Sequence, residues 1–340
     1  MSSSSDWRNR GWPAGGDASR HVAGGKTIAQ EQAKIVVIGS SNMDLVVKAP
    51  RIPQLGETVL GGDFVMVPGG KGANQAVAAA KLGAEVCFVA RLGDDLFGQR
   101  SLANFEKEGV NTEYVTSTPG VASGVALIAV DSAGNNVIVV APGANSRLGP
   151  DDVRRAQREI ASAGAVVAQL EVPVETVECA AQMAHDAGVP FILDPAPAQR
   201  LRPDLLKQVT VLTPNETEAQ ILTGMEVSDE VTASLAAEWL LSSGVGAVIV
   251  TMGAQGFLLA TGTTREFVPA VSVRAVDATA AGDAFTGSLA VGLAQGQSLR
   301  EAAMFAGRVA ALSTTRMGAQ SSMPTRQEVE AFRSAMELDG

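Results

Sequence analysis

The stretch DATAAGDAF, Asp277 to Phe285, places two aspartates around a run of small residues at the start of an apolar segment. If Ala280 to Asp283 begin a helix, their backbone N–H groups lack intrahelical acceptors and create a point of positive potential. An oxyanion or a transferring phosphoryl group fits such a point. Asp283, with an ordinary pKa of about 3.9, is ionised at neutral pH. The pattern therefore predicts a carboxylate base beside an anion hole, formed by Ala280, Ala281, Gly282 and Asp283.

A carboxylate is a weak base, but phosphoryl transfer makes modest demands on its base. In a loose transition state the attacking alcohol becomes acidic late, as its oxygen bonds to phosphorus. A well-placed general base contributes about 10²–10⁴-fold to such a step. The alternative interpretation is structural, with Asp283 capping a helix of small residues. That alternative leaves the density of small residues unexplained.

Two polar side chains follow the first strand-like run, in SSNMDLVV (40–47). Asn42 and Asp44 lie two residues apart, so in an extended segment both side chains point to the same side. Such a pair can grip a vicinal diol, because a carboxylate accepts hydrogen bonds from two hydroxyls. The alternative is turn chemistry at a strand end, which Asn and Asp commonly supply.

A glycine-rich turn, VPGGKGANQ (67–75), brings Lys71 and Asn74 to the start of a helix-like stretch. It matches neither the P-loop pattern, GxxxxGK[ST], nor the complete dinucleotide pattern, GxGxxG. Lysine can donate to hydroxyls at such a turn, and asparagine can both donate and accept. A purely structural turn explains the same stretch equally well.

Further polar residues follow buried strand-like runs. Glu171 lies in QLEVPVE, and TPNETEA places Asn215, Glu216 and Glu218 at a helix start. Acidic residues in a first helical turn are also ordinary partners of the helix dipole. TMGAQG (251–256) is a glycine-spaced turn whose N–H groups can hold a nucleotide phosphate, or an ordinary β-turn.

Composition restricts the class of protein. The chain has 340 residues, 46% of them hydrophobic, and a formal net charge of -10, which argues against nucleic acid or an anionic membrane as the main partner. Cys87 and Cys179 lie in apolar runs, as is typical of reduced core thiols in a cytoplasmic protein. Because His21 and His185 are the only histidines, a His-based triad or His-rich metal site is not expected. No apolar run approaches the roughly 18 residues of a transmembrane helix.

Short apolar runs alternate with helix-like stretches from Lys34 onward, which predicts an α/β domain over residues 34–335. We expect a three-layer α/β/α sandwich whose central sheet is mainly parallel, with ligands beyond the carboxyl ends of its strands. Residues 44–66 and 123–140 alternate without room for helices, and predict a small antiparallel β-lid. Residues 1–33 lack periodicity and are predicted to be a disordered extension. The predicted core strands are 34–39, 86–91, 165–170, 190–194, 209–214 and 247–251.

Seven ordered stretches between Lys34 and Phe332 are more specific together than any one alone. They are SNMD, GGKGANQAVAAAKLGA, LGDDLFG, QLEVP, TPNETEA, AVDATAAGDAFTG and TRMGAQSSMP. In this order they resemble the ribokinase-type (pfkB) family of carbohydrate kinases. GGKGANQ and GANSRL (143–148) are closer to ribose-specific members than to fructose or adenosine kinases.

The resemblance implies a ribokinase-like fold and ATP-dependent phosphorylation of D-ribose at its 5-hydroxyl, giving ribose 5-phosphate and ADP. It makes Asp283 the catalytic base and Ala280, Ala281 and Gly282 its anion hole. The implied sugar-binding positions are Asn42, Met43, Asp44, Gly70, Lys71, Gly72, Ala73, Asn74, Glu171 and Asp283. The implied nucleotide positions are Asn215, Thr251, Met252, Gly253, Ala254, Gln255, Gly256, Gly282, Asp283 and Gly307.

The same resemblance implies two cations and a dimer. Mg²⁺ accompanies ATP, with Glu218 acting on it indirectly through the NxxE pattern that Asn215 begins. K⁺ is implied as an activating ion beside the anion hole, and the subunits of a homodimer are expected to join through their lids. The positions matching the K⁺ site, several through backbone carbonyls, are Asp277, Thr279, Ser313, Arg316, Gly318 and Ser322.

Two positions depart from the family pattern. AAGD stands where GAGD is common, a change that members with this activity tolerate. Gly307 stands where an imidazole often lies near the adenine, which leaves the nucleotide preference open. Two other functions are also open: a kinase for another sugar or a nucleoside, and a sugar-binding regulator without catalysis. A pure binder would need neither Asp283 nor an anion hole.

Overall fold

The computed structural model describes residues 32–339. The extension predicted at residues 1–33 therefore lies outside the described residues, apart from its last two positions. Of those two, Ala33 is buried in the core. None of the described helices is both long and apolar enough to cross a membrane.

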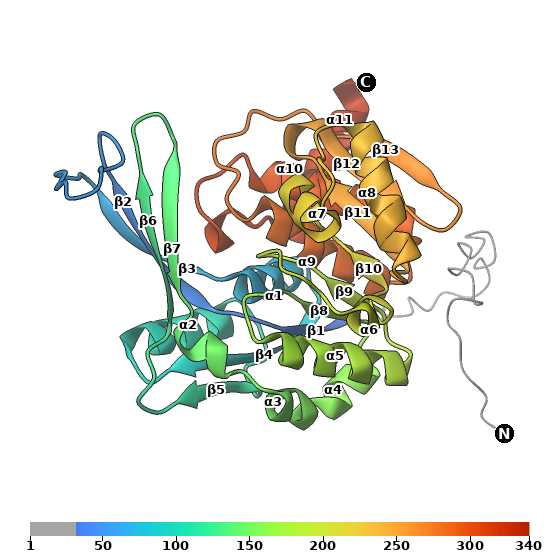
Figure 1. Ribbon diagram of the computed structural model, residues 1–340, viewed down its shortest axis with the longest axis horizontal. Helices are drawn as coiled ribbons and strands as arrows, with labels where there is room; N and C mark the ends of the chain where they lie inside the picture. Colours follow the sequence, from blue (N-terminus) through green and yellow to red (C-terminus); the bar gives the residue numbers. More distant parts are fainter. Residues whose placement is uncertain (1–31, 340) are drawn as a thin grey trace.

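A nine-stranded sheet forms the centre of the molecule, in the order β13-β12-β11-β10-β9-β8-β1-β4-β5 (Figure 1). All neighbouring strands in it are parallel except the pairs β11–β12 and β12–β13, so the mainly parallel sheet is confirmed. The strands are β1 (Lys34–Ile38), β4 (Glu85–Gly93), β5 (Val115–Thr118), β8 (Ala165–Ala168), β9 (Phe191–Leu193), β10 (Val211–Leu212), β11 (Ala247–Thr251), β12 (Gly256–Ala260) and β13 (Arg265–Pro269).

Helices cover both faces of this sheet because its strands are apolar on both sides. In β1, Ile35 and Val37 pack into one core cluster while Val36 and Ile38 pack into the other, as the period of two requires. The first cluster takes in α1 (Lys71–Lys81), α2 (Leu96–Lys107), α9 (Ala281–Ala294), α10 (Leu299–Ser313) and α11 (Arg326–Asp339). The second takes in α3 (Pro150–Arg155), α4 (Gln157–Ser162), α5 (Val174–Ala187), α6 (Pro203–Leu206), α7 (Glu216–Thr223) and α8 (Glu230–Ser242). The predicted three layers are confirmed.

A second, four-stranded sheet projects from the body as a lid, on the left of the view in Figure 1. Its order is β3 (Phe64–Gly69), β2 (Asn42–Lys48), β6 (Gly124–Val130) and β7 (Asn136–Ala141). The prediction of a purely antiparallel lid was wrong in one respect, because the central pair β2–β6 is parallel. The reason is topological: β1 and β5 run in the same direction, and each continues from its carboxyl end into one of these two lid strands.

The helices α1 and α9 approach each other closely at Gly287. A Cβ atom at this position would lie 2.6 Å from the carbonyl oxygen of Gln75 and 3.1 Å from the Cβ of Ala78. Only glycine fits this contact without moving the α1 backbone. The contact therefore sets how near α9, which carries Asp283, lies to α1, which carries Lys71 and Asn74.

We predict that Gly287→Val lowers the free energy of unfolding by about 1–3 kcal/mol, since overpacking forces the two helices apart. Urea denaturation followed by circular dichroism measures the change. Gly262→Val is the matched control, because this glycine lies in an exposed loop with nothing near its Cβ position. The control should change stability by no more than about 0.5 kcal/mol. Equal effects of the two substitutions would contradict the close-contact interpretation.

Candidate active site

Lys71, Asp283, the predicted anion hole and part of the predicted nucleotide site line a cavity of about 180 Å³ at the carboxyl ends of the central strands. This position is the one expected for ligands of a parallel sheet. Segments far apart in the sequence contribute to it, including α1, the end of β9, the start of α7 and the start of α9. The lining residues are Lys71, Asp194, Thr213, Asn215, Glu218, Thr251, Ala278, Ala280, Ala281, Gly282, Asp283 and Thr286.

Asp283 is the buried carboxylate of this cavity, with 5% of its surface exposed. Its Oδ2 accepts a hydrogen bond from Asn74 Nδ2 at 2.8 Å, and its Oδ1 accepts one from Gln75 Nε2 at 3.1 Å. Two amides of one helix, α1, therefore hold the two oxygens from one side. The carboxylate is fixed in orientation, as a general base must be.

Opposing electrostatic effects act on Asp283. Burial raises the pKa of its carboxyl above the ordinary value, while the Lys71 ammonium and the Asn74 amide counteract that rise. Burial of Lys71 alone would lower the pKa of its amine. The carboxylates of Asp194 and Asp283 outweigh burial, so the pKa of Lys71 is raised. The site therefore contains a protonated Lys71 beside Asp283, whose carboxylate is a stronger base than that of an exposed aspartate because it is buried.

The start of α9 has the geometry of an anion site. Ala280, at the N-cap, has a left-handed φ of 60°, uncommon for a residue with a Cβ atom. The amide of Ala281 donates to the carbonyl of Ala278 at 3.2 Å. The amides of Gly282 and Asp283 follow in the first turn, where helical N–H groups lack intrahelical acceptors. Of the four predicted residues, Ala280 thus shapes the turn while Gly282 and Asp283 present amides.

The residues predicted to bind hydroxyls lie beside Asp283, at the base of the lid. Asn42 is buried, and its Oδ1 accepts from Asn145 Nδ2 at 2.7 Å. Asn145 Oδ1 in turn accepts from the Ser41 amide at 2.9 Å. Burial, with the charges of Glu171 and Asp283 nearby, raises the pKa of Asp44 to about 7. These carboxylates therefore share one region, as the sequence interpretation requires.

Glu171 ties three segments together at this point. Its Oε2 accepts from the Ser40 hydroxyl and from the Lys71 amide, the latter at 3.0 Å. Ser40 follows β1, and Lys71 begins α1, so one carboxylate sets the position of both. The other predicted sugar-site residues of these segments are buried at the same junction; they are Met43, Gly70, Gly72 and Ala73.

On the other side of the cavity, Asn215 and Glu218 form a capping box at the start of α7. Asn215 Oδ1 accepts from the Glu218 amide at 2.8 Å, and Glu218 Oε2 accepts from the Asn215 amide at 2.9 Å. Both residues nevertheless line the cavity. Helix capping and a role beside a ligand are therefore compatible in this pattern.

The other predicted nucleotide residues form the turn between β11 and β12. Thr251 reaches the cavity, Met252 is buried, and a 3₁₀ turn (Gly253–Gln255, which includes Ala254) is exposed to solvent before Gly256. Gly307 lies on α10, where a Cβ would approach the Phe257 ring to 3.1 Å. The structure thus places the turn at the cavity and Gly307 behind it, against a buried aromatic side chain.

The predicted cation positions gather where the segment before α9 meets the segment after α10. Asp277 Oδ2 accepts from the Gly318 amide at 2.8 Å, and Oδ1 accepts from the Thr279 amide at 2.9 Å. The hydroxyls of Ser313 and Ser322 donate to nearby carbonyls. The Arg316 guanidinium pairs with Glu328 at 2.6 Å, so only its backbone carbonyl could face a cation.

The sequence interpretation did not assign Gln75, which holds Asp283 from α1, or four residues of the cavity lining, namely Asp194, Thr213, Ala278 and Thr286. Gln75 holds Asp283 and also donates to Asp194 Oδ2 at 2.8 Å. Burial raises the pKa of Asp194 well above its ordinary value. Asp194 ends the predicted strand PFILD, so the carboxyl-end rule could have found it. Gln75 is the last residue of the GGKGANQ stretch, but the local sequence does not show which distant groups it contacts.

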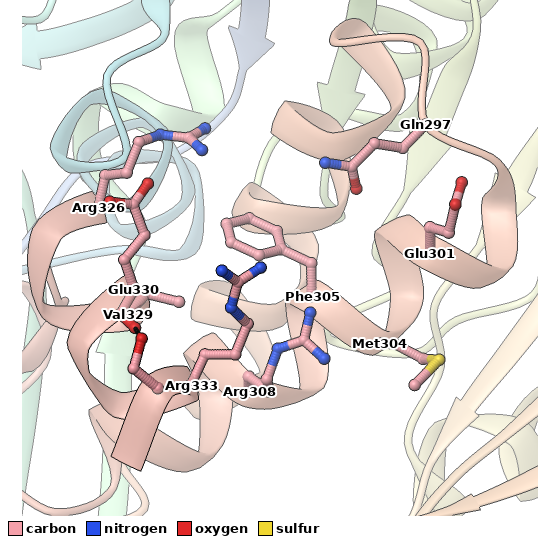
Figure 2. A pocket seen from close by; sticks show the side chains of 10 residues that line it. Gln297, Glu301, Met304, Phe305, Arg308, Arg326, Val329, Glu330 and Arg333 are labelled. Carbon is pink, nitrogen blue, oxygen red and sulfur yellow. Dashed lines mark hydrogen bonds between the residues drawn. The ribbon is translucent and has the colours of Figure 1, made fainter. Parts of the chain in front are cut away.

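A larger cavity, of about 640 Å³, lies between α10 and α11. Figure 2 shows Arg308, Arg326 and Arg333 around it, with Phe305 between them. Its lining includes none of the residues predicted for the sugar, nucleotide or cation sites. The predicted base and anion hole line the smaller cavity around Asp283 and not this one.

Comparison with known proteins shows the family of the chain. The model of the family "pfkB family carbohydrate kinase" matches residues 32–326. A ribokinase from Haemophilus influenzae is 43% identical over 298 residues, covering 88% of this chain and 97% of the relative. A deoxyribokinase from Salmonella typhi is 40% identical over 304 residues, covering 89% of this chain and 99% of the relative. The structure of Arabidopsis thaliana ribokinase with ribose and ATP superposes with a TM-score of 0.82 at 34% identity, covering 88% of this chain and 98% of that one.

We predict a pH-dependent stability difference between the wild-type chain and Asp44→Asn. Because the pKa of Asp44 rises from 3.8 to about 7 on folding, the folded state keeps a proton that the unfolded chain releases. Ionising Asp44 therefore costs stability as the pH rises toward 7. Asp44→Asn lacks this cost, so its urea midpoint relative to wild type should be higher at pH 8 than at pH 5.

The matched control for this measurement is Asp63→Asn, which removes an exposed carboxylate near the lid. It controls for the loss of one negative charge from the chain, because its side chain is exposed to solvent. A difference for Asp44→Asn that does not change with pH would contradict the desolvated environment assigned to Asp44.

Proposed function

Because this chain belongs to the pfkB family of carbohydrate kinases, we propose that it phosphorylates D-ribose at the 5-hydroxyl with ATP, giving ribose 5-phosphate and ADP. The observation that carries the proposal is Asp283. This carboxylate is buried at the open start of α9, is held by two amides, and lies beside Lys71 and the groups suited to hydroxyls. A base next to an anion site is what phosphoryl transfer to an alcohol needs.

In the proposed reaction the sugar lies between the base of the lid and α1. The carboxylates of Asp44 and Glu171 accept hydrogen bonds from its hydroxyls, and the amides of Asn42 and Asn74 hydrogen-bond to others. This arrangement leaves the 5-hydroxyl facing Asp283. Closing of the lid excludes water, which limits transfer of the phosphoryl group to water instead of the sugar.

The transfer itself uses few protein groups. The 5-hydroxyl oxygen bonds to the γ-phosphorus as the bond to the ADP oxygen breaks, and the hydroxyl proton passes to Asp283. The amides of Gly282 and Asp283, with the Lys71 ammonium, stabilise the charge on the phosphoryl oxygens. In other enzymes, removing one preorganised donor of this kind lowers kcat by about 10²–10³-fold.

The nucleotide is proposed to lie along the sheet edge, from Asn215 to the turn at Thr251–Gly256. Mg²⁺ arriving with ATP supplies neutralisation of phosphate charge. Glu218 and Asp194 are the cavity carboxylates that would face its hydration shell. Among residues 32–339, no three His, Cys, Asp or Glu side chains form a ready-made metal site.

A monovalent cation site is proposed beside the start of α9. The Gly318 amide donates a hydrogen bond to Asp277 Oδ2 there, which joins the segment before α9 to the segment after α10. The proposed ligands are the Asp277 carboxylate and backbone carbonyls of these two segments. Oxygen-only ligands of this kind suit a hard cation such as K⁺. Bound there, K⁺ would hold the segment that leads into the anion site.

The lid supports a further proposal, that two copies of the chain form a homodimer through it. Its edge strand β7 is exposed along its whole length, with Ile138 at 51% and Val139 at 61% exposure. Phe64 on β3 and Leu127 on β6 add further exposed apolar surface. An apolar edge strand of this kind is an aggregation hazard unless another chain covers it.

One assay tests the proposed activity: release of ADP in a coupled assay with D-ribose, 2-deoxy-D-ribose, D-fructose and adenosine. We expect the highest kcat/KM with D-ribose and a higher rate with K⁺ than with Na⁺. 2-Deoxy-D-ribose is the informative competitor, because one of the relatives is a deoxyribokinase. Turnover of another sugar without turnover of D-ribose would overturn the substrate, and no ADP release with any of them would favour a sugar-binding regulator.

We predict that Asp283→Asn lowers kcat by about 10²–10⁴-fold while D-ribose still binds, because the variant loses the base and keeps the shape. Isothermal titration with D-ribose checks the binding. Asp204→Asn, an exposed carboxylate on α6, is the control and should keep full activity. Retained turnover in Asp283→Asn would refute its role as the base.

We predict that Ile138→Glu converts the dimer to a monomer. Dimerisation would bury the new carboxylate on β7 with no positive charge to compensate it. Sedimentation velocity of the purified chain measures the change. Val231→Glu changes an equally apolar position on α8, 68% exposed and far from the lid, and should remain dimeric. A wild-type chain that sediments as a monomer would refute the dimer.

A further inference from the structure

A chain of three side-chain amides ends on one oxygen of Asp283. Asn104 Nδ2, on α2, donates to Gln320 Oε1 at 2.7 Å. Gln320 Nε2 donates to Asn74 Oδ1 at 3.1 Å, and Asn74 Nδ2 donates to Asp283 Oδ2 at 2.8 Å. Gln320 is buried and belongs to a 3₁₀ turn (Gln320–Ser322) that follows α10. The hydrogen bonds thus link α2, this turn, α1 and α9, and every one of them donates toward Asp283.

A second chain ends on the other oxygen. Gln169 Nε2, just past β8, donates to Gln75 Oε1 at 2.6 Å. Gln75 Nε2 donates to Asp283 Oδ1 at 3.1 Å and to Asp194 Oδ2 at 2.8 Å. Gln75 and Gln169 are both fully buried. Each oxygen of Asp283 therefore receives an amide that another amide orients.

In these two hydrogen-bond chains, the direction of donation decides which end of each amide faces Asp283. A carboxamide has a donor end and an acceptor end, so Asn74 can turn either of them toward Asp283. Gln320 removes that freedom, because its N–H group requires the Asn74 oxygen to face away from the carboxylate. Gln169 does the same for Gln75. Aligned donors also polarise one another, so the final donation to the carboxylate is strengthened.

The orientation of the Gln169 amide leaves one of its own atoms buried without a hydrogen-bond partner. Gln169 Oε1 is buried and has no hydrogen-bond partner within residues 32–339. A buried acceptor without a partner is costly, and turning the amide over would bring Gln169 Oε1 against Gln75 Oε1. Space for the orphaned oxygen exists because residue 39 is glycine, where a Cβ would lie 2.0 Å from it.

We propose that Gln320 and Gln169 are positioning residues for Asp283, acting through Asn74 and Gln75 to keep both amide donors turned toward its carboxylate. Neither glutamine lines the cavity around Asp283, so neither is placed to touch the reacting atoms. The catalytic consequence rests on the proposed function, in which Asp283 takes the proton of the sugar hydroxyl. The positioning of the Asp283 carboxylate by the two amides does not depend on that proposed function.

The charged groups around Asp283 fix the sign of the expected change. They are Lys71 on α1, Asp44 on β2, Glu171 after β8, Asp194 after β9 and Glu218 on α7. The two amides favour the ionised form and so lower the pKa of Asp283 against burial. A variant that lets either amide turn away should raise that pKa, and the acid limb of the pH–rate profile should move to higher pH.

Gln320→Met and Gln169→Met test this, since methionine keeps the size and length of glutamine and has no amide. With the full-length chain, each should lower kcat/KM for D-ribose about 10-fold and move the acid limb up by about half a unit to one unit. The double variant should show a larger shift than either single variant; the two shifts need not add, because both chains end on the same carboxylate. Ser321→Ala, an exposed neighbour in the same turn, should leave the limb where it is.

A measurement without substrate separates this proposal from the proposed function. In ¹³C NMR of aspartate carboxyl groups, the Asp283 signal is the one missing from Asp283→Asn, and its titration should move to higher pH in both methionine variants. If a methionine variant fails to fold, Asn104→Ala, at the half-buried outer end of one chain, should show a smaller shift in the same direction. An unchanged Asp283 titration in folded variants would overturn the positioning role. A shifted titration without ribose turnover would instead refute the proposed activity alone.

Discussion

The burial of an ionisable carboxylate at the start of α9 is the constraint on which the rest of the structure depends. Burial disfavours the charged form of Asp283, so compensating donors and a cation must lie close by. Three of them, Lys71, Asn74 and Gln75, come from the first turns of α1. The glycine contact between α1 and α9 and the anchoring of the Lys71 amide by Glu171 both serve to bring these groups within reach.

A parallel sheet brings these groups together at one edge, because the carboxyl ends of its strands all lie there. β1, β8, β9, β10 and β11 all run toward the same edge, and each delivers a polar residue just past its carboxyl end. The two central lid strands leave from that edge as well, so the cover stands directly over the site. The proposed binding, chemistry and exclusion of water would therefore all follow from one topological arrangement.

Much of this could be predicted locally, and the failures have physical reasons. Apolar runs of strand length alternating with amphipathic stretches predicted the layers correctly, because that pattern depends only on which faces are buried. The parallel β2–β6 pair was missed because strand direction in a lid depends on where each strand leaves the main sheet. Gln75 was missed because its role lies in partners far away, and an interior helical position carries no local signal of that.

The sequence by itself determined the fold class, the family and the small-residue helix start around Asp283, since each depends on residue type and spacing within short stretches. Only the tertiary structure decided which way each amide points and which donors Asp283 receives. Asn74 and Asp283 are 209 residues apart, and Gln320 and Asn74 are 246 apart. The direction of a hydrogen bond is set by the pair of groups that meet, and these groups meet only when the sheet, α1, α9 and the turn after α10 are packed together.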